Sequence, residues 1–266
     1  MKARIAAAAL AAGRDPVDIA LLAVSKTFPA ESVRAMHALG QVRFGENYVQ
    51  EAHAKMDRLA DLPDLEWHAI GPVQSNKARL VAGLFSWVHS VDSERLARKL
   101  SEARAVHLPP LNVCVQVNVS GEASKSGLAP DDALLLALAV APMPRLSLRG
   151  FMTVARETSD LALQRTQFRV MANLIDAARS RGLTLDTLSM GMSGDLESAI
   201  AEGATLVRVG SALFGARAPV EREPAGQADV GSHPAAGAND EREQPEINNL
   251  STAERATPSM LPENNT

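Results

Sequence analysis

One lysine of this sequence directly follows a short run of β-prone, mostly apolar residues. Lys26 comes immediately after residues 19–25, whereas the other lysines lie at the N-terminus, in amphipathic segments, at the start of a helical pattern or in a polar loop. Burial disfavours the ammonium form and lowers the pKa of a lysine, and a neutral amine can attack an aldehyde to form a Schiff base. Lys26 is therefore a candidate attachment site for a carbonyl compound. The alternative is a lysine that extends into solvent or pairs with a carboxylate.

A second candidate site is the segment 189–195, which joins a β-prone run to a short helical pattern. Backbone N–H groups at the start of a helix, together with the hydroxyl of Ser193, suit a phosphate group. Ser193 could equally be only the N-cap of that helix. The segment is a candidate phosphate site with a purely structural alternative.

A third candidate follows the last β-prone run, at residues 208–215. Gly210 allows the backbone to approach a ligand closely, and Ser211 adds a hydroxyl. Arg208 can face such a ligand or pair with an acid such as Glu46. A Schiff-base lysine and a phosphate site at one location would together suit a phosphorylated aldehyde.

The elements that must position these residues alternate along the chain. Eight β-prone runs are found at residues 19–25, 41–44, 65–70, 86–90, 111–118, 146–152, 185–190 and 205–209. Helical patterns lie between them, at residues 31–39, 46–59, 76–83, 93–106, 130–140, 160–181 and 196–202. Strands that alternate with helices pair in parallel, because each crossover needs a helix.

Eight such units in about 200 residues predict a single (β/α)8 barrel of the TIM type, which is an α/β fold. The alternative is an open doubly wound sheet, which carries a Gly-rich phosphate turn after an early strand. The sequence contains no G-x-G-x-x-G or Walker A segment, so the barrel is favoured. In such a barrel the chemistry lies at the C-terminal ends of the strands, where all three candidate segments fall.

Composition limits the classes of function. Of the 266 residues, 46% are hydrophobic and 22% are charged, which is typical of a soluble globular protein. The net charge of −4 argues against a general nucleic-acid binder. No segment approaches the roughly 18–20 consecutive apolar residues that span a bilayer. The single cysteine, Cys114, excludes an intrachain disulfide and a multi-cysteine metal site, and with no export signal recognised it places the protein in the cytoplasm.

The last part of the chain differs from the rest. Residues 219–266 hold nine acidic groups, three arginines and six of the 15 prolines, but none of the nine aromatic residues. Such a segment buries too little apolar surface to offset the entropy lost on ordering. The sequence therefore predicts a barrel domain over residues 1–218, followed by a disordered, acidic, proline-rich tail over residues 219–266.

Ten short segments run in order over almost all of residues 19–217. They are AVSKT (23–27), FGENYVQE (44–51), WHAIG (67–71), QSNK (74–77), HSVD (89–92), QVN (116–118), KSGL (125–128), RGFMT (149–153), SMGMS (189–193) and RVGSALFGAR (208–217). Together they resemble the pyridoxal phosphate homeostasis protein family, and the tail has no counterpart in the pattern. The resemblance implies a single barrel like the N-terminal domain of alanine racemase, of the kind called fold type III among proteins that bind pyridoxal 5′-phosphate (PLP).

The resemblance also implies a set of cofactor-binding residues. Lys26 would hold PLP as a Schiff base, Arg208 would lie near the pyridine nitrogen, and the remaining positions would bind the phosphate (Ser193, Gly210, Ser211) or line the ring (Asn47, His68, Met152). Gly194 stands where the family usually has an acidic residue, which predicts a looser loop after Ser193. Two histidines without a matched acidic cluster, His68 and His89, make no convincing metal site.

The expected role is that of a carrier. Electron-sink catalysis by PLP usually needs an acidic partner at the pyridinium nitrogen, and an arginine there disfavours that protonation. Racemases of this fold add a second domain with a catalytic tyrosine, as the resemblance implies, and nothing after residue 217 is expected to form one. The only tyrosine, Tyr48, falls instead on a motif position of the homeostasis family.

We therefore expect a monomer that binds, buffers and delivers PLP to PLP-dependent apo-enzymes, with no catalytic residue and no robust turnover. A PLP-dependent racemase or lyase is the first alternative. A Schiff-base aldolase that uses Lys26 without a cofactor is the second.

Overall fold

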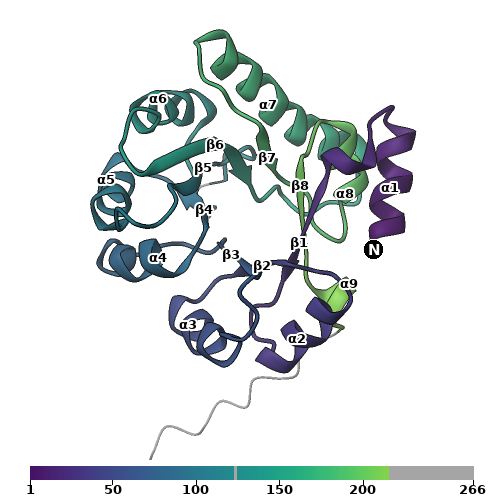
Figure 1. Ribbon diagram of the computed structural model, residues 1–266. Coiled ribbons are helices and arrows are strands. Elements are labelled where there is room, and N and C mark those ends of the chain that lie inside the picture. Colours follow the sequence, from purple (N-terminus) through teal and green to yellow (C-terminus); the bar gives the residue numbers. More distant parts are fainter. Residues whose placement is uncertain (123–124, 216–266) are drawn as a thin grey trace, which may run out of the picture. The chain divides into compact units, whose positions relative to one another are not determined.

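Eight parallel strands close into a barrel in the order β1 to β8, and β8 pairs with β1. The computed structural model describes residues 1–122 and 125–215 (Figure 1). The strands are β1 (Ala20–Val24), β2 (Arg43–Glu46), β3 (Glu66–Ala69), β4 (Trp87–Val91), β5 (Leu111–Val117), β6 (Leu146–Thr153), β7 (Thr187–Ser189) and β8 (Leu206–Val209). The predicted (β/α)8 barrel is confirmed, and the open doubly wound alternative is wrong. The expected tail, residues 219–266, lies outside the described residues.

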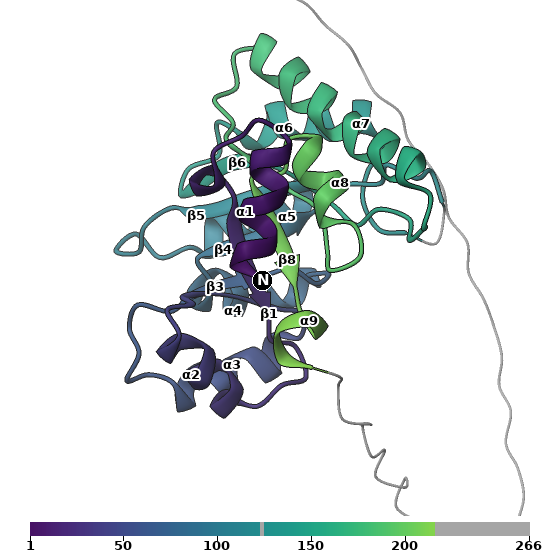
Figure 2. The ribbon, with the colours of Figure 1, turned by 90° about the vertical axis from the view of Figure 1, so that its right-hand side faces the viewer.

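Helices surround the barrel on its outer side (Figure 1). They are α1 (Lys2–Ala11), α2 (Ala30–Ala38), α3 (Val49–Arg58), α4 (Ala78–Leu84), α5 (Glu94–Ala103), α6 (Pro130–Val140), α7 (Leu161–Ser180), α8 (Leu196–Ala201) and α9 (Ser211–Phe214), with 3-10 turns at η1 (Pro16–Asp18) and η2 (Ser75–Lys77). The first helix, α1, precedes the barrel and packs against α8 (Figure 2). No helix in the described part of the chain has the length and apolar character needed to cross a bilayer.

Local sequence explains where two of the outer helices begin. The Ser93 hydroxyl accepts a hydrogen bond from a backbone N–H at the start of α5, and the Asp160 carboxylate accepts two at the start of α7. Such caps satisfy N–H groups that have no partner within the helix. Helix α7 then buries Phe168, Met171 and Ile175 against the barrel, which is the helical spacing seen in the sequence.

The second strand ends two residues later than predicted. The sequence predicts a strand at residues 41–44, whereas β2 continues through Gly45 to Glu46. Gly45 fits within the strand because the neighbouring side chains leave little space there: an added Cβ would lie 3.0 Å from Cδ1 of Ile70. The consequence is that Glu46 belongs to the barrel wall and is not the first residue of a helix.

The barrel interior contains polar as well as apolar side chains. Trp87, Cys114 and Met152 form a small buried cluster, and His68 and His89 are fully buried beside it. Cys114 is a free thiol whose pKa is raised to about 12 by burial, as expected for a small residue inside a strand. The interior is therefore able to hold hydrogen-bonded groups away from water.

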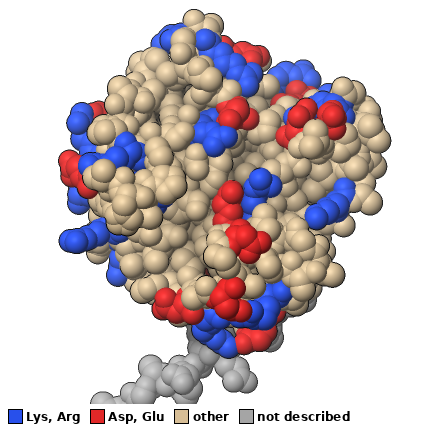
Figure 3. Space-filling model, in the orientation of Figure 1, with Lys and Arg blue, Asp and Glu red and all other residues tan. Residues whose placement is uncertain are grey.

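Charged side chains of both signs are interspersed on one face of the molecule. Figure 3 shows acidic and basic groups side by side around a central hollow, with large neutral areas between them. On that face, charges of opposite sign partly cancel one another's field, so a ligand would meet local rather than long-range electrostatic attraction.

Candidate functional site

A cavity of about 700 Å³ opens at the C-terminal ends of the strands. We call it the strand-end cavity. Its lining includes residues that follow β1, β2, β3, β6 and β7, together with residues of and after β8. Six of the eight predicted cofactor-binding residues line it, namely Lys26, Asn47, Ser193, Arg208, Gly210 and Ser211. The barrel thus brings together residues up to 185 positions apart in sequence (26 to 211), as the strand-end argument predicts.

The other two predicted residues, His68 and Met152, lie deeper in the barrel. Both side chains are buried in the interior, and neither belongs to the lining of the strand-end cavity. His68 precedes the C-terminal residue of β3, and Met152 precedes that of β6. Inward-pointing side chains of a barrel stack in layers. Position along the strand does not alone set the depth, because Arg208 also precedes the last residue of its strand and still lines the cavity.

Lys26 follows a residue that is held by a buried ion pair. The Lys55 Nζ donates hydrogen bonds to the Ser25 carbonyl oxygen (2.8 Å) and to Glu46 Oε1 (2.6 Å). The Ser25 hydroxyl donates to the same carboxylate oxygen at 2.6 Å. Because Ser25, Glu46 and Lys55 are all buried, these contacts fix the backbone where it leaves the strand and enters the strand-end cavity.

The residue after Lys26 is also fixed. Thr27 has a φ of 67°, in the left-handed region that residues with a Cβ seldom adopt. Its backbone N–H donates a 2.7 Å hydrogen bond to Glu51 Oε1, which also accepts one from Lys55 at 3.1 Å. The strained turn is therefore held by the same group of side chains that holds Ser25, and both neighbours of Lys26 are anchored on one cluster.

Glu46 is the most unusual member of that cluster. Burial raises the pKa of its carboxyl group, while the charge of Lys55 and hydrogen bonds from Lys55 and Ser25 lower it. Its second oxygen, Oε2, is buried and has no hydrogen-bond partner among the described residues. The cluster therefore contains a carboxylate whose charge depends strongly on Lys55.

Sequence reasoning missed Lys55. It placed this lysine in an ordinary amphipathic helix, in which charged side chains normally lie on the solvent-exposed face. The helix instead directs Lys55 inward, and its side chain is only 4% exposed. Neither spacing nor composition distinguishes these two orientations.

Arg208 projects from β8 into the barrel interior at the base of the strand-end cavity. Its guanidinium donates to the Ser189 carbonyl (2.6 Å), the Ser189 hydroxyl (2.8 Å) and the Thr153 carbonyl (2.6 Å). Burial lowers its pKa to about 10, so the group remains a cation at neutral pH. The sequence allowed Arg208 either to face a ligand or to pair with an acid such as Glu46. In the structure Arg208 lines the cavity, and Glu46 pairs with Lys55.

The loop that carries Ser193 is held from two sides. The backbone N–H of Met192 donates a 2.6 Å hydrogen bond to Asp195 Oδ1, and Arg4 of α1 donates a 2.9 Å bond to the Ser193 carbonyl while it pairs with Glu197. The N-cap of α8 is Asp195. Ser193 is therefore not that cap, and its hydroxyl is one of the groups that line the cavity.

Two glycines give this end of the barrel its shape. Gly191 has a φ of 91°, and a Cβ there would lie only 2.6 Å from the Ala199 Cβ. Gly71 packs on Asn47, whose carbonyl oxygen would lie 2.6 Å from an added Cβ. Glycine is the residue that permits both the positive φ and the close approach, so the Ser193 loop and Asn47 depend on glycine for their positions.

Metal chemistry has no obvious place in the described part of the chain. No group of three or more His, Cys, Asp or Glu side chains there is arranged to hold a metal ion. The lining of the strand-end cavity combines an amine, a guanidinium, amides and hydroxyls with the carboxylates of Glu157 and Asp195. Its amine, guanidinium and hydroxyls suit an organic anion with a carbonyl group.

Comparison with known proteins agrees with this geometry. The family model of the alanine racemase N-terminal domain matches residues 3–218. The pyridoxal phosphate homeostasis protein of Pseudomonas aeruginosa is 60% identical over 215 residues, which cover 81% of this chain and 92% of that protein. The chain belongs to the pyridoxal phosphate homeostasis protein family.

Other members of the homeostasis family share the same extent of similarity. The Escherichia coli K12 protein of that name is 49% identical over 216 residues, 80% of this chain and 92% of the relative. Among solved structures, PipY of Synechococcus elongatus with PLP bound has a TM-score of 0.70 and 38% sequence identity, and the match covers 79% of this chain and all of that one. The similarity to the homeostasis family thus spans the barrel as a whole.

Proposed function

We propose that this protein binds PLP in the strand-end cavity, keeps the free cofactor low and delivers it to PLP-dependent apo-enzymes. The observation that carries the proposal is the convergence of Lys26, Arg208, Ser193 and Ser211 on one cavity. A volume of about 700 Å³ suits a small organic ligand. PLP supplies an aldehyde, an aromatic ring and a phosphate, and the lining offers a partner for each.

Each residue has a distinct task in this proposal. The Lys26 amine would hold PLP through a C=N bond to the aldehyde carbon, whose oxygen leaves as water, and Ser193 and Ser211 would donate hydrogen bonds to the phosphate. Gly210 leaves room at the same end, because an added Cβ would lie 3.3 Å from the Val24 carbonyl oxygen. Asn47 and Arg208 contact the ring.

The same geometry favours a carrier over an enzyme. PLP acts as an electron sink best when an acidic group keeps its ring nitrogen protonated. Arg208 is a cation at neutral pH, since its pKa stays at about 10, and it would oppose that second positive charge. The relatives of this chain are named as homeostasis proteins, so we propose binding and transfer of PLP without robust amino-acid turnover.

We propose that the protein works as a monomer in the cytoplasm. Six of the eight residues expected to bind PLP already line one cavity of a single chain, which supports a monomeric carrier. The sequence has a single cysteine and that thiol is buried, which fits a reducing compartment.

The proposal is tested by loading the full-length chain with PLP, reducing it with borohydride and mapping the labelled peptide. A pyridoxyl group on Lys26 is expected, with loss of the label in Lys26→Ala and its retention in Lys77→Ala, a control on another βα unit. A label on any other lysine would overturn the site. Turnover of amino acids well above that of free PLP would overturn the carrier role in favour of a racemase or lyase.

A further inference from the structure

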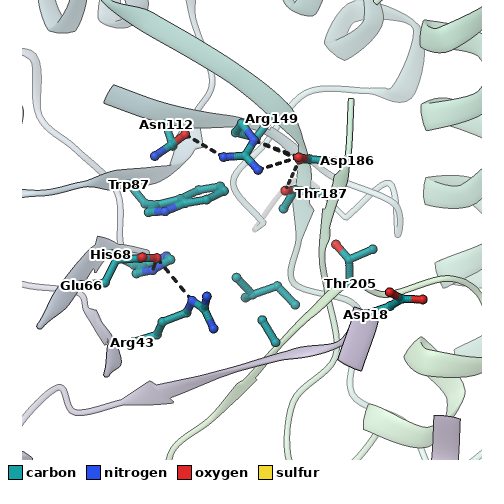
Figure 4. A pocket seen from close by; sticks show the side chains of 12 residues that line it. Asp18, Arg43, Glu66, His68, Trp87, Asn112, Arg149, Asp186, Thr187 and Thr205 are labelled. Atoms are coloured by element: carbon teal, nitrogen blue, oxygen red, sulfur yellow. Dashed lines mark hydrogen bonds and ion pairs between the residues drawn. The ribbon is translucent and has the colours of Figure 1, made fainter. Parts of the chain in front are cut away.

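A second cavity, of about 360 Å³, lies at the opposite end of the barrel, where the strands begin (Figure 4). We call it the strand-start cavity. Figure 4 shows Glu66 and His68 on one wall, with Trp87 over the His68 ring and Arg149 over Trp87. The rings of His68 and Trp87 are stacked with centroids 5.2 Å apart, and the Arg149 guanidinium lies 4.9 Å from the Trp87 ring centre.

Hydrogen bonds run from Glu66 through the barrel interior to Arg208. Glu66 Oε1 is 2.8 Å from His68 Nε2, and His68 Nδ1 is 2.9 Å from His89 Nε2. His89 Nδ1 is 2.9 Å from the Ser189 hydroxyl oxygen, which is 2.8 Å from Arg208 Nη1. We call these five residues the buried hydrogen-bond path. It joins the strand-start cavity to the strand-end cavity.

The two ends of the path determine which atoms carry protons. The Glu66 carboxylate can only accept, so His68 Nε2 carries a hydrogen. In a neutral His68 the other nitrogen then accepts, which requires a hydrogen on His89 Nε2. The remaining nitrogen of a neutral His89 accepts from the Ser189 hydroxyl, whose oxygen accepts from Arg208. A guanidinium can only donate, so the hydrogen bond from Arg208 is consistent with the proton positions deduced from the Glu66 end. Every donor along the path therefore points from Arg208 towards Glu66.

Burial keeps the two histidines in these forms. Both rings are fully buried, and desolvation lowers the pKa of His68 and, more strongly, that of His89. At His68 the hydrogen bond and charge of Glu66 raise the pKa against this effect of burial, while Arg43 lowers it. At His89 the charges of His68 and Arg208 lower the pKa further. An additional proton on either ring would place two donors against each other or remove an acceptor from the path.

We propose that Glu66 is a remote positioning residue for Arg208, acting through His68, His89 and Ser189. The carboxylate fixes one tautomer at each histidine, and the last hydrogen bond of the path holds the Arg208 guanidinium in one orientation at the base of the strand-end cavity. The effect of Glu66 on cofactor binding rests on the proposed PLP function. The predicted histidine tautomers do not depend on that function, because they are a property of the protein without ligand.

The first test is nitrogen-15 NMR of the histidine rings in the full-length chain without PLP. Signals of His68 and His89 are assigned by their loss in His68→Gln and His89→Gln. We expect both rings to be neutral with the hydrogen on Nε2. A cationic ring, or a hydrogen on Nδ1 of either neutral ring, would overturn the proposal.

The second test removes the carboxylate from the path. In Glu66→Ala we expect His68 to populate both tautomers, and PLP to bind about fivefold more weakly with an altered absorption spectrum, a coupling of ordinary size. Glu66→Gln keeps an acceptor oxygen and is expected to restore most of the Nε2–H form. Asp186→Asn removes a carboxylate of the same cavity that pairs with Arg149 outside the path, and is expected to change neither readout.

A double variant tests whether Glu66 acts through the path. Ser189→Ala removes the link to Arg208, so Glu66→Ala combined with Ser189→Ala is expected to bind PLP no more weakly than the weaker single variant. The proposal would be overturned if the double variant lost as much PLP affinity as the product of the two single losses. It would also be overturned if Glu66→Ala had no effect, or had the same effect as Asp186→Asn. If the wild-type chain failed to bind PLP, the proposed function would be wrong, and the tautomers would still decide whether the path exists.

Discussion

Lys55 Nζ lies 2.6 Å from Glu46 Oε1, and both side chains are removed from water. The ion pair supports the turn that contains Lys26, because Lys55 and Glu46 also bind Ser25. A charge buried without its partner is costly. The cluster therefore makes the geometry around Lys26 sensitive to residues that do not line the cavity.

Replacing Lys55 should destabilise the protein substantially. In Lys55→Met, Glu46 loses the charge and the hydrogen bond that lower its pKa, so we expect a loss of about 3–5 kcal/mol in the free energy of unfolding. Urea denaturation of the chain without PLP measures it. Lys99→Met, at an exposed position of α5, is the matched control and is expected to change stability by less than about 0.5 kcal/mol.

The Lys55→Met effect should also depend on pH. Burial already raises the pKa of Glu46, and the variant raises it further. At pH values between the pKa of Glu46 in the unfolded chain and its higher pKa in the folded chain, the folded variant binds one proton more than the unfolded one. The free energy of unfolding therefore falls as the pH rises through that range. The loss should therefore be larger at pH 8 than at pH 5. An equal loss at both values would show that Glu46 is not the group left unpaired.

The hydroxyl of Ser193 should recognise the phosphate of PLP and no other part of it. Ser193→Ala is expected to weaken PLP binding about ten- to a hundredfold, the value of one hydrogen bond to a charged group, and to leave the affinity for pyridoxal, which lacks the phosphate, unchanged. Spectroscopic titration with both compounds measures the two effects. Ser159→Ala, elsewhere in the cavity lining, should alter neither affinity; equal losses for PLP and pyridoxal would contradict the assignment.

The loop that carries Ser193 should tolerate a side chain at Gly194 but not at Gly191. Gly191→Ala combines a positive φ with a Cβ only 2.6 Å from the Ala199 Cβ, so we expect a loss of about 1–3 kcal/mol and weaker PLP binding. No atom lies within 4 Å of a Cβ added to Gly194, and Gly194→Ala should be nearly neutral. Thermal unfolding and PLP titration compare the two variants, and a stable Gly191→Ala with normal affinity would contradict the role given to this turn.

His89 should make stability fall as the solution becomes acidic. Its folded pKa lies well below the ordinary value of 6.5, so the unfolded chain binds a proton near that pH and the native state does not. The stability contributed by the neutral ring is present above pH 6.5 and is lost on acidification, at a slope of up to about 1.4 kcal/mol per pH unit. Urea midpoints at pH 7 and pH 5.5 should show a shallower slope in His89→Gln than in wild type or in the exposed control His107→Gln.

The sequence was sufficient for the fold and for most of the cavity lining because both depend on periodicity. Strand ends can be located from apolar runs, and a barrel places all strand ends at one rim. Lys26, Ser193, Arg208 and Ser211 follow from that rule. His68 and Met152 came from the family resemblance, and their contact with the ring stays a prediction. Depth inside a barrel depends on the stagger between strands, which no single segment encodes.

The supporting contacts could not be predicted for a different reason. The buried hydrogen-bond path takes its members from β3, β4, β7 and β8, and its longest step joins residues 100 positions apart. Each of these residues has an unremarkable local sequence, and a hydrogen bond between them exists only after the barrel has closed. Lys55 was missed because inward and outward orientations of an amphipathic helix produce the same charge spacing.

The burial of Cys114 has a practical consequence for labelling the protein. Its thiol is enclosed in the barrel and its pKa is raised to about 12, so it holds almost no thiolate at neutral pH and should not react with alkylating dyes in the folded state. No other cysteine occurs in the sequence. The wild-type chain is thus a ready background for site-specific fluorophores, and a cysteine introduced on the exposed side of α7 would be the single point of attachment in the native protein.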